Sequence, residues 1–524
     1  MQKPLNVIVT GLLLGCLLSV SAILLKNHER KGSLSKMPVA TLRMPMAISD
    51  DPRESDPAQI LFNTTWGHLE NLASPLVEWS VDGQIRAGAA KTFTWIGDEL
   101  HLDMRDDYRS ADGMPITAGD AAFSLKRLIM LARNTHGFIA DFLCGDVELK
   151  SIDDECKGIR VSGNTLILKP LRGKDFLLRM LTAMDFVVLL KSQIDPVSLK
   201  IKSFRNTTGP YRIEENSEGH LTYVANKGHW HHSDKMPLEI DLIPYDPKQS
   251  VRDENNRPVF EIFTDDKTDI VINFSSDRPD LYSDASTLVP SASLVPTLDI
   301  GRLIAVFTPR GLKELSATRR IAIGKAIRDA ARSVIVTGNK INTPVEQFFA
   351  SYGDGSLSAE QLSQLRGIFA AVSPDTTGAG VRIALPKSMA HVAEKFKASL
   401  PEADCRVDAI DYVFGEADGE PHVYLISTDT GWTEDLGLLS YSVNMKVFYP
   451  SDQAAGQKWV RDYVEITDKE ERLARLRDLH FKALSDPWVV PIASQAYYTL
   501  VRSPWQYHGP KLFNSGALWH LRRP

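Results

Sequence analysis

The sequence has few cysteines and none of the common catalytic motifs. Its 524 residues include four cysteines, and no two of them form a Cys-x-x-Cys pair, which argues against a zinc ribbon or a dithiol redox site. The GxSxG, HExxH, P-loop and GxGxxG patterns are also missing. Neither sign of charge dominates, because 60 basic and 66 acidic side chains leave a net charge of −6. We therefore expect no catalytic residues, no metal or other cofactor, and no nucleic-acid partner.

The length of the chain and its N-terminal segment predict a large exported protein. Single hydrophobic cores stop growing near roughly 250–300 residues, so 524 residues predict two large lobes or three domains. Residues 7–25 are almost continuously apolar, and three interpretations stay open. The segment is a signal peptide cleaved after residues 20–22, a lipoprotein signal with Cys16 as the lipidated residue, or an uncleaved membrane anchor. Each places the body of the protein in the periplasm or on the outer face of the cytoplasmic membrane.

Two of the remaining cysteines lie close together in the sequence. Cys144 and Cys156 belong to one segment, so an oxidising compartment would allow a local disulfide between them. The alternative is that both are buried free thiols.

The most informative local pattern covers residues 112–128, DGMPITAGDAAFSLKRL. Asp112 and Gly113 are typical turn residues, and Thr117 stands where a hydroxyl can cap a helix, with Asp120 in its first turn. The spacing predicts that Lys126 and Arg127 point away from the apolar face. That face is formed by Ala121, Leu125, Leu128 and Ile129.

This segment resembles the "DG-x-P-x-TAED-x-x-x-S-x-x-R" stretch of the family 5 extracellular solute-binding proteins, the peptide-binding subunits of ABC importers. Four other stretches are similar to landmarks of that family in the expected order, and the resemblance runs from about residue 39 to 505. They are LVEWSVDGQIRAGAAKTFTW at residues 76–95, TGPY at 208–211 with NKGHW at 226–230, TDIVIN at 268–273, and the helical segment 316–336.

The resemblance implies an α/β, two-lobe periplasmic-binding-protein fold, class II-like, with an extra subdomain in the first lobe. Lobe I would comprise residues 39–265 and 486–524, with the subdomain at about 75–170, and lobe II would comprise 266–485. Residues 1–26 would be the signal peptide or anchor, and 27–38 a linker. Independently, segments 381–385, 388–400, 405–413 and 422–427 alternate strand and helix patterns, which predicts a partly parallel sheet.

The candidate ligand site is GWTED, directly after the last of these strands. It resembles the family's "GW-x-x-D" segment, which implies that Asp435 binds the ligand's α-amino group, that Trp432 forms a pocket wall and that Gly431 offers a main-chain contact. The alternative is a surface acidic loop with a buried tryptophan. After Asp435 the sequence departs from the family pattern.

The implied function is a monomeric, non-enzymatic receptor for peptides or other small solutes that delivers them to the permease of an ABC importer. Two alternatives are a membrane-anchored sensory or regulatory protein with the same fold and an exported hydrolase.

Two other clusters invite a functional interpretation. His220, His229, His231 and His232 lie near Asp234 and could suggest a metal site, but solvated loop histidines are the favoured interpretation. The basic residues between 310 and 332 alternate with apolar ones, which predicts an amphipathic helix with a basic outer face rather than a nucleic-acid-binding surface.

Overall fold

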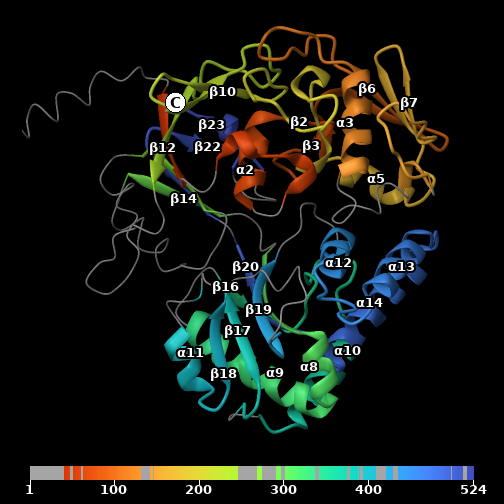
Figure 1. Ribbon diagram of the computed structural model, residues 1–524, viewed down its shortest axis with the longest axis vertical. Coiled ribbons are helices and arrows are strands. Elements are labelled where there is room, and N and C mark those ends of the chain that lie inside the picture. Colours follow the sequence, from red (N-terminus) through yellow and green to blue (C-terminus); the bar gives the residue numbers. More distant parts are fainter. Residues whose placement is uncertain are drawn as a thin grey trace, which may run out of the picture. The chain divides into compact units, whose positions relative to one another are not determined.

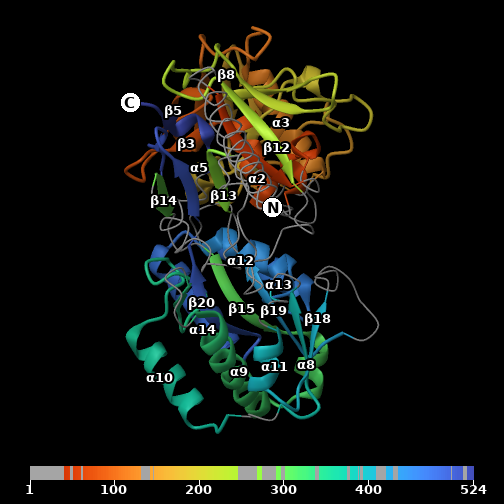
Figure 2. The same ribbon diagram turned by 90° about the vertical axis from the view of Figure 1, so that its left-hand side faces the viewer.

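The structure of the protein is a computed structural model (Figures 1 and 2). Leu42–Pro524 forms one compact unit. The predicted signal or anchor at 1–26 and the linker at 27–38 lie outside the described residues. No helix within the described ranges is long and apolar enough to cross a membrane. The described residues are 41–47, 51–60, 63–131, 142–145, 147–245, 268–273, 291–296, 301–336, 342–374, 378–386, 389, 393–408, 420–428, 435–496, 498–510 and 516–524.

Two sheets combine strands that are far apart in the sequence. A four-stranded sheet has the order β1-β12-β11-β10, from β1 (Thr41–Ala47), β12 (Glu239–Tyr245), β11 (Leu221–Ala225) and β10 (Tyr211–Glu215). In a three-stranded sheet, β21 (Tyr498–Arg502) pairs antiparallel with β13 (Ile270–Asn273) and with β14 (Ala292–Pro296). Short pairs join β2 (Ser74–Pro75) to β9 (Val187–Val188), β3 (Val77–Trp79) to β4 (Ile85–Ala87), and β22 (Gln506–Tyr507) to β23 (Leu521–Arg522).

A further antiparallel sheet packs against the predicted capped helix. Its order is β5-β6-β8-β7, from β5 (Ala90–Ile96), β6 (Glu99–Met104), β8 (Thr165–Leu168) and β7 (Ile159–Ser162). Helix α3 (Ala118–Leu131) contacts β7 and β8. This sheet falls within the range predicted for the extra subdomain, whose boundaries stay a prediction.

The N-terminus of α3 has the predicted cap. The Thr117 hydroxyl accepts the N–H of Asp120 at 3.3 Å, and the Asp120 carboxylate accepts the N–H of Thr117 at 3.0 Å. The expectation that Arg127 points away from the core is wrong. Its guanidinium is buried because it forms a bidentate ion pair with Asp56 and donates to the carbonyl of Leu199. The predicted apolar face is buried and consists of Ala121, Leu125, Leu128 and Ile129.

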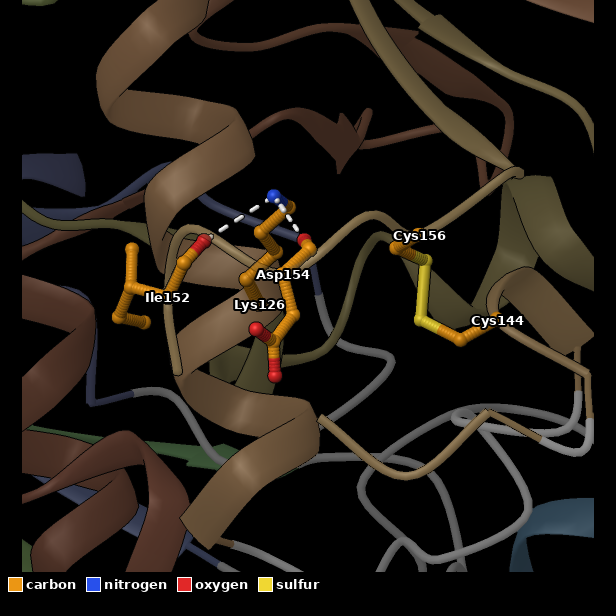
Figure 3. Close-up of a disulfide and its surroundings, with 5 residues drawn as sticks. All are labelled: Lys126, Cys144, Ile152, Asp154 and Cys156. Carbon is orange, nitrogen blue, oxygen red and sulfur yellow. Dashed lines mark hydrogen bonds between the residues drawn. A yellow bond between two sulfur atoms is a disulfide. The ribbon is translucent and has the colours of Figure 1, made fainter. Parts of the chain in front are cut away.

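A disulfide closes the segment that follows α3 (Figure 3). It joins Cys144 and Cys156, whose Cα atoms are 4.6 Å apart. Lys126 on α3 donates to the carbonyl oxygens of Ile152 and Asp154, at 3.0 and 2.7 Å. The helix and the disulfide therefore hold the same loop.

A six-stranded sheet carries the predicted parallel pairing. Its order is β16-β20-β15-β19-β17-β18, and β17 runs parallel to both β18 and β19. Strand β15 is buried on both faces, because α9 and α11 cover one face and a second apolar cluster lies on the other (Figure 2). The strands are β16 (Asn342–Pro344), β20 (Val489–Gln495), β15 (Gly301–Phe307), β19 (Val423–Thr428), β17 (Arg382–Pro386) and β18 (Asp404–Asp408).

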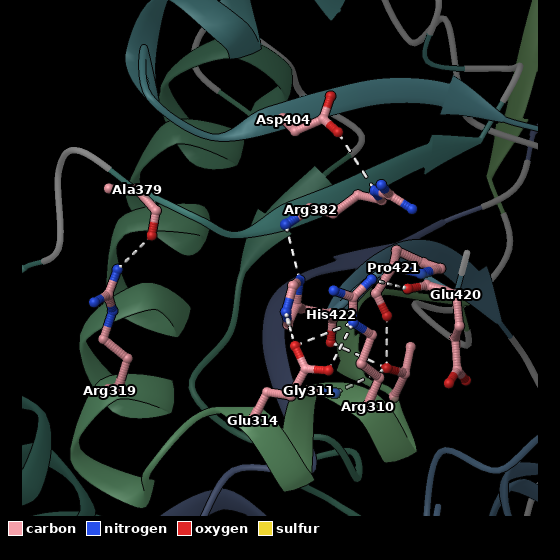
Figure 4. A network of polar contacts seen from close by, with 11 residues as sticks. Arg310, Gly311, Glu314, Arg319, Ala379, Arg382, Asp404, Glu420, Pro421 and His422 are labelled. Carbon is pink, nitrogen blue, oxygen red and sulfur yellow. Dashed lines mark hydrogen bonds and ion pairs between the residues drawn. The ribbon is translucent and has the colours of Figure 1, made fainter.

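A polar network holds the end of this sheet at which β19 begins (Figure 4). The Nδ1 atom of His422 accepts the backbone N–H of Arg382 at 3.0 Å, so its Nε2–H donates to Glu314 at 2.9 Å. A Cβ atom at Gly311 would lie only 2.2 Å from the His422 carbonyl oxygen, so this approach requires glycine. The network fixes the start of β19 between its neighbours.

Several helices were not expected from the sequence, among them α10, α12 and α13. The basic helix α9 was expected, but its predicted basic outer face is wrong for three residues. Arg320 pairs with Asp486, Arg328 lies over the Phe369 ring, and Arg332 donates to the carbonyl of Ile492. The α-helices not yet given are α2 (Asn63–Leu72), α5 (Lys174–Met180), α8 (Pro309–Glu314), α9 (Ala317–Ala331), α10 (Ala359–Ala370), α11 (Ala393–Ser399), α12 (Asp435–Asn444), α13 (Gln453–Val464) and α14 (Lys469–Ser485).

Short helical turns complete the described secondary structure. They are η2 (Pro52–Glu54), η3 (Pro57–Gln59), η4 (Met184–Phe186), η5 (Lys191–Gln193), the π-helical η7 (Arg332–Val336) and η10 (Leu518–His520).

Candidate functional site

The predicted ligand-binding carboxylate lies at the start of a helix. Strand β19 ends at Thr428, and α12 begins at Asp435, whose side chain is half-buried. Gly431 and Trp432, the other two predicted site residues, lie outside the described residues. A carboxylate in the first helical turn interacts favourably with the positive end of the helix dipole. Helix α12 therefore favours an ionised carboxylate at this position.

A glycine-containing loop surrounds the Asp435 carboxylate. The backbone N–H of Gly355 donates to its Oδ2 atom. A Cβ atom at Gly353 would lie 2.5 Å from the same oxygen, which is closer than real Cβ atoms come to their neighbours. The loop can therefore reach the carboxylate only because residue 353 has no side chain.

Two buried side chains hold this loop in place. The Nε2 atom of His480 on α14 accepts the N–H of Phe348 at 3.0 Å, and its Nδ1 atom lies 2.8 Å from the carbonyl oxygen of Gly355. Since a backbone N–H can only donate, the ring proton belongs on Nδ1, which donates to Gly355. Arg302 on β15 donates to the carbonyl of Phe348 at 2.8 Å. His480 and Arg302 thus position the donor to Asp435, and sequence reasoning missed both.

Burial controls the charge of these groups. The pKa of Asp435 is raised to about 6, chiefly by burial; the Gly355 hydrogen bond and Arg302 lower it, and nearby Asp354 raises it. Burial also lowers the pKa of His480 to about 4. At neutral pH the site therefore holds an ionised carboxylate beside an uncharged imidazole. A carboxylate can accept about four hydrogen bonds, so Asp435 can bind an ammonium group in addition to the Gly355 N–H.

The expectation of solvated loop histidines is wrong for His229 and His231. His229 is buried; its Nδ1 accepts the N–H of His231 at 3.2 Å, and its Nε2 lies 2.9 Å from the Ser74 hydroxyl. His231 lies 2.8 Å from a carboxylate oxygen of Glu78 and stacks on Trp519. No group of three or more potential metal ligands is found among the residues that the structure describes. His229 and His231 pack into an aromatic cluster with Tyr108, Trp230 and Trp519 instead.

Solved structures share the fold of this chain, whereas comparisons of its sequence give no match. No protein-family model matches the sequence, and no curated protein matches it. The murein tripeptide binding protein MppA of Escherichia coli has a TM-score of 0.68 at 17% identity, over 92% of this chain and 98% of that chain. The periplasmic oligopeptide-binding protein OppAIV of Borrelia burgdorferi has a TM-score of 0.69 at 13% identity, over 93% and 100% of the two chains.

A third similar structure is the binding protein AgaA from A. tumefaciens R10, in complex with agropinic acid. It has a TM-score of 0.68 at 15% identity and covers 92% of this chain and 99% of that chain. The protein thus has the α/β two-lobe fold of the periplasmic solute-binding proteins, which confirms the predicted fold class.

Proposed function

We propose that this protein is an extracytoplasmic receptor that binds peptides and delivers them to the permease of an ABC importer. The observation that carries the proposal is the half-buried Asp435 carboxylate in the first turn of α12. The fold supports the receptor role, because the similar structures are solute-binding proteins. Their bound solutes differ in chemistry, so the peptide class rests on the site and not on the fold.

The chemistry of Asp435 favours a free amine as its ligand. Loss of contact with water strengthens a charge–charge hydrogen bond, and an ammonium group offers three donors to a carboxylate. The Gly355 N–H keeps the carboxylate in one position before the ligand arrives, which lowers the entropic cost of binding. Backbone pairing with an extended peptide would add affinity without selecting side chains.

Calorimetric titration with trialanine and N-acetyl-trialanine tests the amine contact. Trialanine should bind, and acetylation of its amine should weaken binding roughly 10- to 100-fold, as expected for the loss of a hydrogen bond between charged groups. The Asp435→Asn variant should lose the same factor for trialanine and should no longer distinguish the two peptides. Asp354→Asn removes a neighbouring exposed charge but leaves Asp435 in place, so it serves as the matched control and should change affinity much less.

Equal affinity of the wild type and Asp435→Asn would contradict the amine contact. Mass spectrometry of the solute that co-purifies with the protein provides a second readout, because a non-peptide solute would contradict the peptide class and leave a receptor role standing. Hydrolysis of trialanine by the purified protein would contradict the receptor role itself.

A further inference from the structure

A cavity walled by aromatic rings lies near the C-terminal segment, separate from Asp435. Its volume is about 70 Å³, and its lining combines residues of α2, β3, the segment after β11 and the last twenty residues of the chain. The aromatic lining residues are Trp66, Trp79, Trp230, Tyr507 and Trp519. Indole and phenol rings present a negative electrostatic face, which attracts cations.

Two carboxyl groups also line this cavity, and they are in different states. Glu78 is paired, since one of its oxygens lies 2.8 Å from His231 and 3.1 Å from Arg86. Glu70 accepts a single hydrogen bond, from the indole N–H of Trp66 at 3.1 Å. Its other oxygen, Oε2, is buried without a hydrogen-bond partner among the described residues. A buried acceptor of this kind is costly unless a donor reaches it.

One ring of the cavity wall already contacts a cation that belongs to the protein. The guanidinium of Arg105 lies 5.0 Å from the centre of the Trp230 ring. The Nε1 atoms of Trp79 and Trp230, two residues that line the cavity, are buried without hydrogen-bond partners among the described residues. Stacking of His231 on Trp519, with ring centres 4.0 Å apart, holds the opposite wall.

We propose that this cavity binds the guanidinium or primary ammonium head group of a small organic cation. Glu70 Oε2 would accept hydrogen bonds from the head group, and the indole rings would surround it. The size of the cavity suits this head group. A water molecule needs roughly 10–15 Å³ of cavity volume, so the cavity has room for about five waters. A guanidinium group has four heavy atoms and is of comparable size. This binding does not depend on the function proposed for Asp435.

Cation binding would be coupled to the release of a proton. Burial raises the pKa of Glu70 to about 8, so the carboxyl group holds its proton at pH 7. When the cation enters, the O–H bond breaks, the proton leaves to solvent, and the carboxylate accepts an N–H of the ligand. Burial raises the pKa of neighbouring Tyr507 and lowers those of His229 and His520, so these groups stay uncharged, and Glu78 is already paired. Affinity should therefore rise about tenfold between pH 6 and 7 and less steeply between pH 7 and 8, where the pKa is reached, or about 50-fold in total.

Calorimetric titration of the full chain with methylguanidinium tests the proposal, and methylurea provides an uncharged ligand of nearly the same shape. Methylguanidinium should bind more tightly at pH 8 than at pH 6, and methylurea should not bind measurably. Glu70→Gln should weaken methylguanidinium binding at pH 8 at least tenfold and remove its pH dependence. Glu218→Gln, at an exposed position, should bind methylguanidinium as the wild type does.

Trp79→Leu provides a second variant in case Glu70→Gln fails to fold, and it should weaken methylguanidinium binding about fivefold. The proposal is overturned if the wild type binds no methylguanidinium, if methylurea binds equally well, or if neither Glu70→Gln nor Trp79→Leu changes the affinity. Normal trialanine binding together with any of these results would leave the receptor function standing.

Discussion

Removal of the buried guanidinium of Arg127 should strongly destabilise the protein. Arg127 donates to both oxygens of Asp56, at 2.9 and 2.5 Å, and to the carbonyl of Leu199 at 2.7 Å. The relative exposure of the two charged side chains is 2% for Arg127 and 15% for Asp56. Leu199 adopts a left-handed backbone conformation with φ of 58°, so this contact also supports a strained turn.

The magnitude follows from what Arg127→Met would leave behind. Methionine keeps most of the aliphatic volume, so packing changes little. The Asp56 carboxylate would retain the N–H of Ala58 but lose its counter-charge in a nearly buried position. Loss of one partner of such a pair costs about 3–5 kcal/mol. We expect the free energy of unfolding to fall by about that amount.

Urea unfolding of the purified chain, followed by circular dichroism, measures this loss. Arg160→Met is the matched control, because Arg160 pairs with Glu99 at the surface and should cost no more than about 1 kcal/mol. The double variant Asp56→Ala with Arg127→Met should be less unstable than the sum of the two single variants, since the unpaired charge is then absent. A loss of under about 1 kcal/mol in Arg127→Met, or strict additivity, would refute the reasoning.

Three further predictions concern stability. Replacement of both Cys144 and Cys156 by Ser should lower the free energy of unfolding by about 3 kcal/mol in urea titrations under oxidising conditions. Under reducing conditions the variant and the wild type should be equally stable. Gly209→Ala should lower the thermal midpoint, because the new Cβ would lie 2.3 Å from the carbonyl carbon of Leu72; an unchanged midpoint would contradict that close approach. Burial lowers the pKa of His480 to about 4, so between pH 6.5 and 4 this histidine binds a proton in the unfolded protein but not in the folded one. The free energy of unfolding should therefore fall by up to about 3 kcal/mol as the pH drops from 6.5 to 4. Urea titrations of His480→Asn at both pH values should lack this contribution.

Local chemistry made parts of the fold predictable. The capping residues and the apolar positions of α3 are close to one another in the sequence, and the structure confirms both predictions. The strands around β17 alternate with helices along the sequence. This alternation predicts parallel pairing, which the structure also confirms. Helix α10 also had a local signal that was overlooked: Ser358 and Gln361 form a capping box at its start.

Other features carried no usable local signal. Helix α12 is buried on nearly all sides, polar Ser440 and Ser442 included, so its polar and apolar residues do not separate onto two faces from which a helix could be recognised. Arg127 has the side chain of a typical surface residue, and its burial depends on Asp56, 71 positions away.

The sequence by itself determined the class of the fold and one carboxylate of the candidate site, because capping, spacing and motif order are properties of neighbouring residues. Only the tertiary structure decided what surrounds that carboxylate. The donor to Asp435 comes from Gly355, 80 positions earlier, and the loop that carries it is held by His480 from another helix. Such partners meet only when distant segments pack together. The charge of a buried group depends on these partners and on its separation from water, so it too is decided by the folded chain.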